Sequence, residues 1–165
     1  AINIDPTLED KVDIIQNAIE LGHMLGLLEP KVAILAAVET VNSKMRSTID
    51  AAALCKMADR RQIRGGLLDG PLAFDNAVSL VAAKTKGIRS AVAGNADILV
   101  VPDLESGNMV AKQLEYLADA LMAGVVLGAR VPIVLTSRAD TAETRAASCA
   151  IAQLMAHRKR EALKV

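Results

Sequence analysis

The chain has 165 residues, of which 52% are apolar and only 1% aromatic, and its 19 basic residues balance its 19 acidic ones. This length suits one α/β domain, or one domain with part of another. The balanced charge gives no general attraction to nucleic acid or to an anionic membrane, and the shortage of aromatic residues argues against binding by base stacking. We therefore expect neither nucleic acid nor a membrane among its partners.

Apolar residues at helical spacing predict a first helix over residues 7–26, with Thr7 at its N-cap. The run at 31–36 is typical of a short buried strand. The next predicted elements are a helix from 47 or 48 to 61, a strand over 65–69 that Gly70-Pro71 ends, a helix over 73–84 and a strand over 97–101.

The last third of the chain continues the same alternation. Its predicted elements are a helix over 109–121, two apolar runs at 125–127 and 131–135, and a helix over 140–159 with a basic end. Strands that alternate with helices favour parallel pairing through right-handed crossovers. The expected class is α/β, with a three-layer α/β/α arrangement around a mostly parallel sheet.

The residues that follow the last predicted strand form the first candidate site. Thr136 and Ser137 offer hydroxyl groups, and Arg138 offers a planar fork that matches phosphate or carboxylate oxygens. Asp140 or Thr141 would cap the long helix, whose N-terminus adds free N–H groups and a partial positive charge. Together these groups predict an anion site. The alternative is a capping box of Ser137 with Asp140 beside a surface arginine.

The second candidate lies where the strand at 65–69 is expected to end. Asp69 and Asp75 place two carboxylates at a strand-to-helix junction. Gly70 lets a ligand or another backbone approach closely, and Pro71 would pre-set the first helical turn. The alternative is an ordinary helix start with a hydrophobic staple.

Two further polar loops follow predicted strands. In the loop at 102–108, Asp103 favours the start of a helix, and Gly107-Asn108 lies at a turn that would take a positive φ. In the loop at 39–46, Arg46 and its polar neighbours could meet a phosphate. The alternatives are capping and turn chemistry for the first loop and a solvated loop for the second. Because carboxyl ends of parallel strands meet at one sheet edge, several of these candidates should gather there.

The cysteine and histidine residues form no catalytic or metal-binding motif. Cys55 and Cys149 lie far apart in helical patterns, which favours buried thiols over a catalytic one, and His23 and His157 have no ligand partner at useful spacing. No glycine-rich nucleotide motif and no metal cluster is visible. The acidic start of the chain argues against a secretory signal, and no apolar run reaches membrane-spanning length. We therefore expect a cytoplasmic protein without a bound metal.

Three linked segments together resemble the phosphate acetyltransferase/phosphate butyryltransferase family. They are Asp-Gly-Pro-Leu-x-Phe-Asp at 69–75, Asp-Ile-Leu-x-x-Pro-Asp-Leu-x-x-Gly-Asn at 97–108 with Lys112 downstream, and residues 132–138, which end in Ser137-Arg138. The form at 135–141 is similar to the butyryltransferase-like branch, which includes enoyl-CoA hydratase/phosphate acetyltransferase fusions. The resemblance implies an isocitrate/isopropylmalate-dehydrogenase-like fold, with two α/β domains and an active-site cleft between them.

The resemblance also implies how this chain divides. Residues 1–130 would form the second α/β domain, which carries the subunit contact of a homodimer. Residues 131–165 would be a strand and helix that return to a first domain, which is missing because the N-terminal half of the family pattern has no counterpart here. The chain begins at Ala1, inside a loop and without Met, which either processing or truncation would explain, and the resemblance favours truncation.

Family members move an acyl group between coenzyme A and inorganic phosphate, so the resemblance implies a coenzyme A thioester and phosphate or acyl phosphate as ligands, with no tightly bound cofactor. A serine-arginine pair lines the family's cleft, and Ser137-Arg138 matches it. A nearby aspartate takes the thiol proton, a role that we assign to Asp140, with Glu143 as the alternative. We predict Ser137 and Asp140 as catalytic residues. The residues predicted to bind substrate are Thr136, Arg138, Asp69, Asp103 and Asn108.

The predicted reaction is direct transfer in a ternary complex, which needs neither cysteine. Two alternatives remain open. One is a nicotinamide-dependent decarboxylating dehydrogenase of the same fold, although no Asp-x-x-x-Asp metal cluster is present. The other is a non-catalytic dimerisation module.

Overall fold

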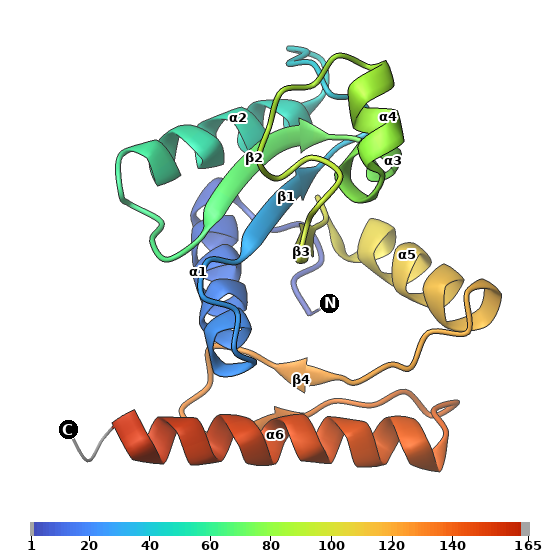
Figure 1. Ribbon diagram of the computed structural model, residues 1–165. Coiled ribbons are helices and arrows are strands. Elements are labelled where there is room, and N and C mark those ends of the chain that lie inside the picture. Colours follow the sequence, from blue (N-terminus) through green and yellow to red (C-terminus); the bar gives the residue numbers. More distant parts are fainter. Residues whose placement is uncertain (1, 163–165) are drawn as a thin grey trace. The chain divides into compact units, whose positions relative to one another are not determined.

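The computed structural model describes residues 2–162 and divides into two compact units (Figure 1), which we call unit 1 (described residues up to 108) and unit 2 (described residues from 109). The elements that begin in unit 1 are α1 (Leu8–Met24), β1 (Lys31–Leu35), α2 (Arg46–Asp59), β2 (Leu67–Leu72), α3 (Phe74–Val78), α4 (Leu80–Thr85), β3 (Ile98–Val100) and α5 (Leu104–Leu117). Unit 2 continues α5 and adds β4 (Val125–Val126), β5 (Ile133–Val134) and α6 (Ala142–Ala162). No described helix is long and apolar enough to cross a membrane.

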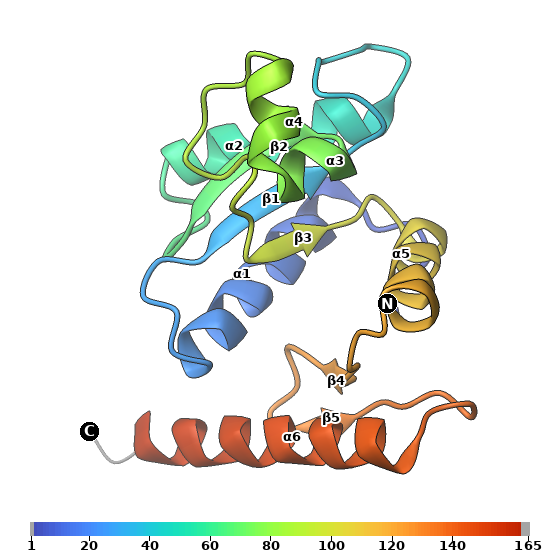
Figure 2. The same ribbon diagram turned by 45° about the vertical axis from the view of Figure 1, so that its right-hand side comes forward.

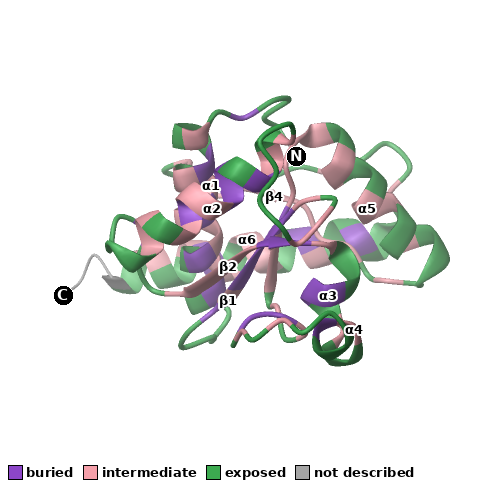
Figure 3. Ribbon diagram, turned by 90° about the horizontal axis from the view of Figure 1, so that it is seen from above, coloured by how far each residue is buried: buried purple, intermediate pink, exposed green. Residues whose placement is uncertain are grey.

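Unit 1 is built on a parallel sheet with strand order β2-β1-β3, in which β1 is the central strand (Figure 2). Alternate residues of β1 face opposite sides of the sheet. Val32 and Ile34 belong to a buried cluster with α1 and α2, whereas Ala33 and Leu35 belong to a second cluster with α3 and α4. Helices therefore cover both faces, as expected for the three-layer α/β class, and β1 is the most buried strand (Figure 3).

Helix α1 forms where the spacing predicts it. The Thr7 hydroxyl accepts a hydrogen bond from the Asp10 N–H, and the Asp10 carboxylate accepts one from the Thr7 N–H, so a complete capping box starts the helix. Ile15 and Ile19 are fully buried one helical turn apart, against the sheet. The predicted helix at 7–26 is confirmed.

The expected end of the second strand is wrong. Strand β2 continues through Gly70 and Pro71 to Leu72. Pro71 is tolerated because β2 is an edge strand, where a missing N–H need not break the ladder. A Cβ at Gly70 would lie 2.8 Å from the Ile34 Cβ, so the glycine permits close strand packing. Pro71 therefore does not open a helix.

The predicted helix at 73–84 is two helices. Ser79 adopts an extended conformation between α3 and α4, and its hydroxyl accepts a hydrogen bond from the Ala82 N–H. A serine that caps a new helix interrupts the old one, because its backbone leaves the helical region. Periodicity alone does not show such a break.

The expected positive-φ turn at Gly107-Asn108 is also wrong. Both residues lie inside α5, which begins at Leu104, five residues before the predicted start. Gly107 serves close packing instead, since a Cβ there would lie 2.9 Å from the Val101 Cγ2. The helix starts early because Asp103 caps it, as described below.

Unit 2 departs from the parallel pattern. Strands β4 and β5 pair antiparallel, with Val125 opposite Val134. The buried Ser148 side chain links the pair to α6, because its hydroxyl accepts a hydrogen bond from the Gly124 N–H and donates one to the Thr144 carbonyl. The predicted α/β class with a mostly parallel sheet is confirmed, and this two-stranded ribbon is its antiparallel part.

Candidate functional site

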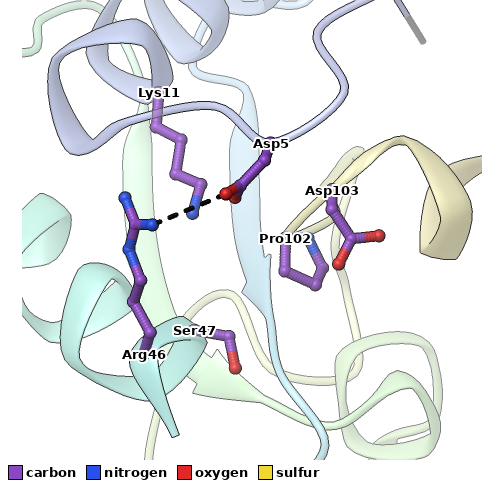
Figure 4. A pocket seen from close by; sticks show the side chains of 6 residues that line it. All are labelled: Asp5, Lys11, Arg46, Ser47, Pro102 and Asp103. Atoms are coloured by element: carbon purple, nitrogen blue, oxygen red, sulfur yellow. Dashed lines mark ion pairs between the residues drawn. The ribbon is translucent and has the colours of Figure 1, made fainter.

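The carboxyl ends of β1, β2 and β3 lie at one edge of the unit 1 sheet, because all three strands run parallel. A pocket of about 230 Å³ lies in this unit (Figure 4). The lining residues come from the segment before α1, from α1, from the start of α2 and from the loop after β3; they are Asp5, Lys11, Arg46, Ser47, Pro102 and Asp103. This is the edge at which open α/β sheets bind ligands.

A buried ion pair lies behind the pocket. The Lys11 Nζ lies 2.7 Å from the Asp50 Oδ2, and both side chains are largely buried. The Arg46 Nε lies 3.6 Å from the same Asp50 oxygen, and the Arg46 Nη1 lies 3.8 Å from the Asp5 Oδ2. Lysine is almost never buried unless it is paired, so Asp50 explains how α1 tolerates Lys11 at an inward position.

Asp103 is brought to this pocket, but one of its oxygens has a structural task. Its Oδ1 accepts hydrogen bonds from the Ser106 N–H and the Ser106 hydroxyl, both at 2.7 Å, and so caps α5. These hydrogen bonds, with a smaller contribution from the Lys11 charge, lower the pKa of Asp103. Asp103 is therefore ionised at neutral pH, and the capping interpretation of this loop is correct.

The other two predicted residues of unit 1 do not line the pocket. Asp69 lies within β2 rather than at its end, and its Oδ1 accepts a hydrogen bond from the Gly70 N–H at 2.8 Å. Asn108 is exposed in the second turn of α5. The structure thus brings Asp103 to the pocket but leaves Asp69 and Asn108 outside it.

The predicted residues of unit 2 share one tight turn before α6. The Ser137 N–H donates to the Asp140 Oδ2 at 2.7 Å, and the Asp140 N–H donates to the Ser137 carbonyl at 3.1 Å. The Ser137 hydroxyl accepts from the Ala139 N–H at 3.3 Å. Thr136 is half-buried, and Arg138 is exposed and forms no ion pair within residues 2–162.

The capping residue of α6 is Thr141 and not Asp140. Its hydroxyl accepts a hydrogen bond from the Thr144 N–H, three residues on. The alternative interpretation of Ser137 and Asp140 as a capping box is therefore wrong, because their hydrogen bond closes a turn ahead of the helix. Within the described residues, the carboxylate of Asp140 contacts the Ser137 N–H through its Oδ2 only. Glu143 is exposed in the first turn of α6.

The two cysteines differ from one another. Burial, followed by the charges of Asp69 and Asp59, raises the pKa of the Cys55 thiol to about 12, so this residue is an inert thiol. Cys149 is exposed, which contradicts the prediction that both thiols are buried. It lies one residue past Ser148, and that step turns it about 100° away from the inward face of α6.

Residues 1–153 match the family model described as "Phosphate acetyl/butaryl transferase". The chain belongs to this family. It is 67% identical over 162 residues to a phosphate acetyltransferase of Rhizobium meliloti, an alignment that covers 98% of this chain and 51% of that protein. It is 55% identical over 152 residues to a probable phosphate butyryltransferase of Bacillus subtilis, with 92% and 51% covered. The chain therefore spans about half the length of the curated relatives it matches.

Solved structures agree with this phosphate acyltransferase membership. A branched-chain phosphotransacylase from Enterococcus faecalis matches with a TM-score of 0.86 and 38% identity, covering 95% of this chain and 56% of that one. A phosphotransacetylase from Streptococcus pyogenes matches with a TM-score of 0.80 and 31% identity, covering 96% and 48%. The resemblance found in the sequence is confirmed, and the comparisons favour neither the dehydrogenase nor the dimerisation module.

The sequence prediction missed part of the pocket of this phosphate acyltransferase chain. Lys11 is buried with Ile15, Ile19 and Gly22, which repeat the spacing of one helix face. A lysine at an inward position of an apolar stripe needs a buried partner, and that signal could have located the ion pair with Asp50. Asp5 and Ser47 carry no comparable signal, because each is an ordinary polar residue near a helix start.

Proposed function

We propose that the protein transfers a short acyl group, acetyl or butyryl, between coenzyme A and inorganic phosphate. The observation that carries this proposal is the family match over residues 1–153, together with relatives named phosphate acetyltransferase and phosphate butyryltransferase. Coenzyme A is then a substrate, and the chemistry requires no tightly bound cofactor. A thioester substrate and a chain of balanced charge support a cytoplasmic location.

The turn at 136–140 offers the groups that this transfer needs. In the direction that forms the thioester, the Asp140 carboxylate takes the proton of the coenzyme A thiol. The thiolate sulfur attacks the acyl carbon of the acyl phosphate and forms the C–S bond. The Ser137 hydroxyl donates to the oxyanion, and the C–O bond breaks as phosphate leaves with the bonding pair, held by Arg138.

Local geometry supports these roles. The Ser137 oxygen accepts from a backbone N–H, so its own hydrogen remains available for an oxyanion. Asp140 is held by the Ser137 N–H, which positions the carboxylate beside the serine. Thr136 adjoins this turn and Asp103 lines the pocket of unit 1, which supports both as substrate-binding residues. Asp69 and Asn108 have weaker support, because neither lines that pocket.

We further propose that residues 131–165 complete a domain whose remainder lies outside this chain, with residues 1–130 as the second domain. The support is the exposure of Ile133, Val134 and Leu135 on a two-stranded ribbon, an arrangement that is marginal in water without further cover. We also propose a homodimer formed through unit 1. Exposed apolar side chains of α3 and α4 support it, namely Phe74, Val78, Leu80 and Val81.

The test is coenzyme A release from acetyl-CoA and butyryl-CoA in the presence of phosphate, measured on the full-length parent protein, because the proposed domain is incomplete without residues outside this chain. Ser137→Ala should lower kcat by roughly 10²–10³-fold, the usual effect of losing one oxyanion donor. Thr85→Ala is the matched control, because this exposed hydroxyl bonds only to a carbonyl of its own helix. Equal rates for the Ser137→Ala variant and the unmodified protein would refute the site, and no release from either thioester would refute the function.

A further inference from the structure

The unit 1 pocket has a donor-rich side that acyl transfer at Ser137 does not use. Lys11, Arg46 and Ser47 line it. Arg46 also ends the loop at 39–46, where the sequence alone suggests contact with a phosphate. The five other polar residues of that loop, which are Glu39, Thr40, Asn42, Ser43 and Lys44, do not line the pocket. Arg46 is therefore the residue of this loop that could contact a ligand there.

The guanidinium of Arg46 has open donors. Its distances of 3.6 Å to the Asp50 Oδ2 and 3.8 Å to the Asp5 Oδ2 exceed the length of an N–H···O hydrogen bond. No other ion pair of Arg46 is found in the described part of the chain. A planar guanidinium whose N–H donors are not hydrogen-bonded can donate to two oxygens of one acidic group.

The ion pair with Lys11 explains why Asp50 forms no hydrogen bond with Arg46. The Asp50 Oδ2 lies 2.7 Å from the Lys11 Nζ, so the closest cation of this carboxylate is Lys11 and not Arg46. Asp50 accepts a hydrogen bond from one of the three N–H groups of the Lys11 ammonium. Because Lys11 also lines the pocket, it has donors left for a ligand.

The Asp5 carboxylate lies beside the Arg46 guanidinium, in the position that the acidic group of a ligand would take. Its side chain is 75% exposed and faces Arg46 across the pocket (Figure 4). An exposed ion pair of this length contributes little, so a competing anion can displace it. Asp103 does not interfere in the same way, because its Oδ1 is held by Ser106.

We infer that the unit 1 pocket binds a phosphate group, held by Arg46, Lys11 and the Ser47 hydroxyl after Asp5 moves away. The choice of phosphate among acidic groups rests on the proposed function, in which both substrates carry phosphate. The ligand then lies beside the cations of Lys11 and Arg46 and the carboxylate of Asp103, while Lys11 stays paired with Asp50. Binding is therefore weak and decreases with salt.

The test is a titration of the protein followed by ¹⁵N–¹H NMR, with the Arg46 Nε–H and the Ser47 amide as reporters. Inorganic phosphate, coenzyme A and 3′-dephospho-coenzyme A are the three titrants. Saturable shifts with phosphate assign the pocket to the inorganic ion. Shifts with coenzyme A alone assign it to the 3′-phosphate, and shifts with both coenzyme A forms assign it to the pyrophosphate. The absence of saturable shifts with all three overturns the inference.

Two variants separate binding from a purely structural role. Arg46→Gln should weaken phosphate binding at least about tenfold, since a bidentate charged contact is lost. Asp5→Asn should tighten it about two- to fivefold, because the competing exposed ion pair is removed. Arg89→Gln, at an exposed arginine outside the pocket, should change nothing. Unchanged affinity in Arg46→Gln, or weaker binding in Asp5→Asn, overturns the inference.

These readouts are independent of turnover. If phosphate saturates the Arg46 signal while no coenzyme A is released from any thioester, the proposed function fails and the anion site stands. If turnover depends on Ser137 while the Arg46 signal is insensitive to all three titrants, the anion site fails and the proposed function stands.

Discussion

The two units bury their apolar residues to very different extents. In unit 1, Ile15, Ile19, Val32 and Leu54 are fully buried around the central strand. In unit 2, the apolar run that contains β5 is exposed, and its residues are Val131 at 65%, Ile133 at 44%, Val134 at 37% and Leu135 at 50%. Unit 1 therefore contains a core of its own, whereas the apolar ribbon of unit 2 is only partly covered by the described residues.

This difference separates stability from chemistry. The side chains proposed to act on the substrate lie in the turn at 136–140, in the unit with little core. Most of the buried apolar residues lie in unit 1. Substitutions in that turn should therefore change activity with little change in the free energy of unfolding, and substitutions in the unit 1 core should do the reverse.

The largest expected effect is on catalysis, from Asp140→Asn. Asparagine keeps an acceptor for the Ser137 N–H, so the turn should survive, but it cannot take the thiol proton. We expect kcat for coenzyme A release to fall by roughly 10²–10⁴-fold with an unchanged melting temperature. Asp119→Asn is the matched control, since this exposed aspartate of unit 2 has a positive φ that asparagine accepts. A rate within a few fold of the unmodified protein would rule out Asp140 as the base.

The core of unit 1 gives the largest expected loss of stability. Leu54→Ala should lower the free energy of unfolding by about 2–5 kcal/mol, because Leu54 is fully buried between α2 and the sheet. Leu28→Ala removes the same atoms from a residue that is 93% exposed, and should change it by less than about 0.5 kcal/mol. Urea denaturation measures both. Similar losses in the two variants would contradict the assigned core.

The buried ion pair gives a smaller effect of a different kind. Lys11→Met leaves the Asp50 carboxylate without its closest partner, which should cost about 3 kcal/mol. The loss stays at the low end of the usual range because Arg46, at 3.6 Å, can turn toward Asp50. The double variant Lys11→Met with Asp50→Leu should regain most of the lost free energy of unfolding in the same denaturation experiment. A double variant that is less stable than Lys11→Met would show that the pair itself, and not the stranded charge, matters.

The smallest expected effect is the pH dependence of the α5 cap. The pKa of Asp103 is lowered in the folded chain, so its contribution is complete above its unfolded pKa of about 3.9 and is lost as the pH falls through the folded value. Asp103→Asn keeps a capping oxygen but removes the titration. We expect the variant to show a shallower fall in unfolding free energy below about pH 4. Identical pH profiles would exclude Asp103 as a contributor.

Several elements could be predicted from the sequence for a clear physical reason. Helix α1 follows from an apolar stripe and a capping box, and β1 follows from a short apolar run without breakers. The predictions for Pro71 and Gly107 failed because each depended on a tertiary neighbour, and the predicted helix at 73–84 failed because periodicity does not show the local cap at Ser79. Pro71 is allowed by an edge position, Ser79 interrupts a continuous pattern, and Gly107 packs against Val101.

The candidate site divides in the same way. The Ser137-Arg138 motif and its nearby aspartate could be found from local sequence, because the turn that holds them is closed by hydrogen bonds within four residues. The pocket of unit 1 could not, since Asp5, Lys11, Arg46 and Asp103 come from four separate segments.

The sequence by itself determined the family and the α/β class, because these depend on short motifs and on periodicity. Only the tertiary structure decided that Lys11 is buried against Asp50 and that Arg46 keeps free donors beside a pocket. The physical reason is that a side chain's charge and hydrogen-bonding capacity depend on which distant residues desolvate and pair it, and parallel strands bring such residues together only after folding.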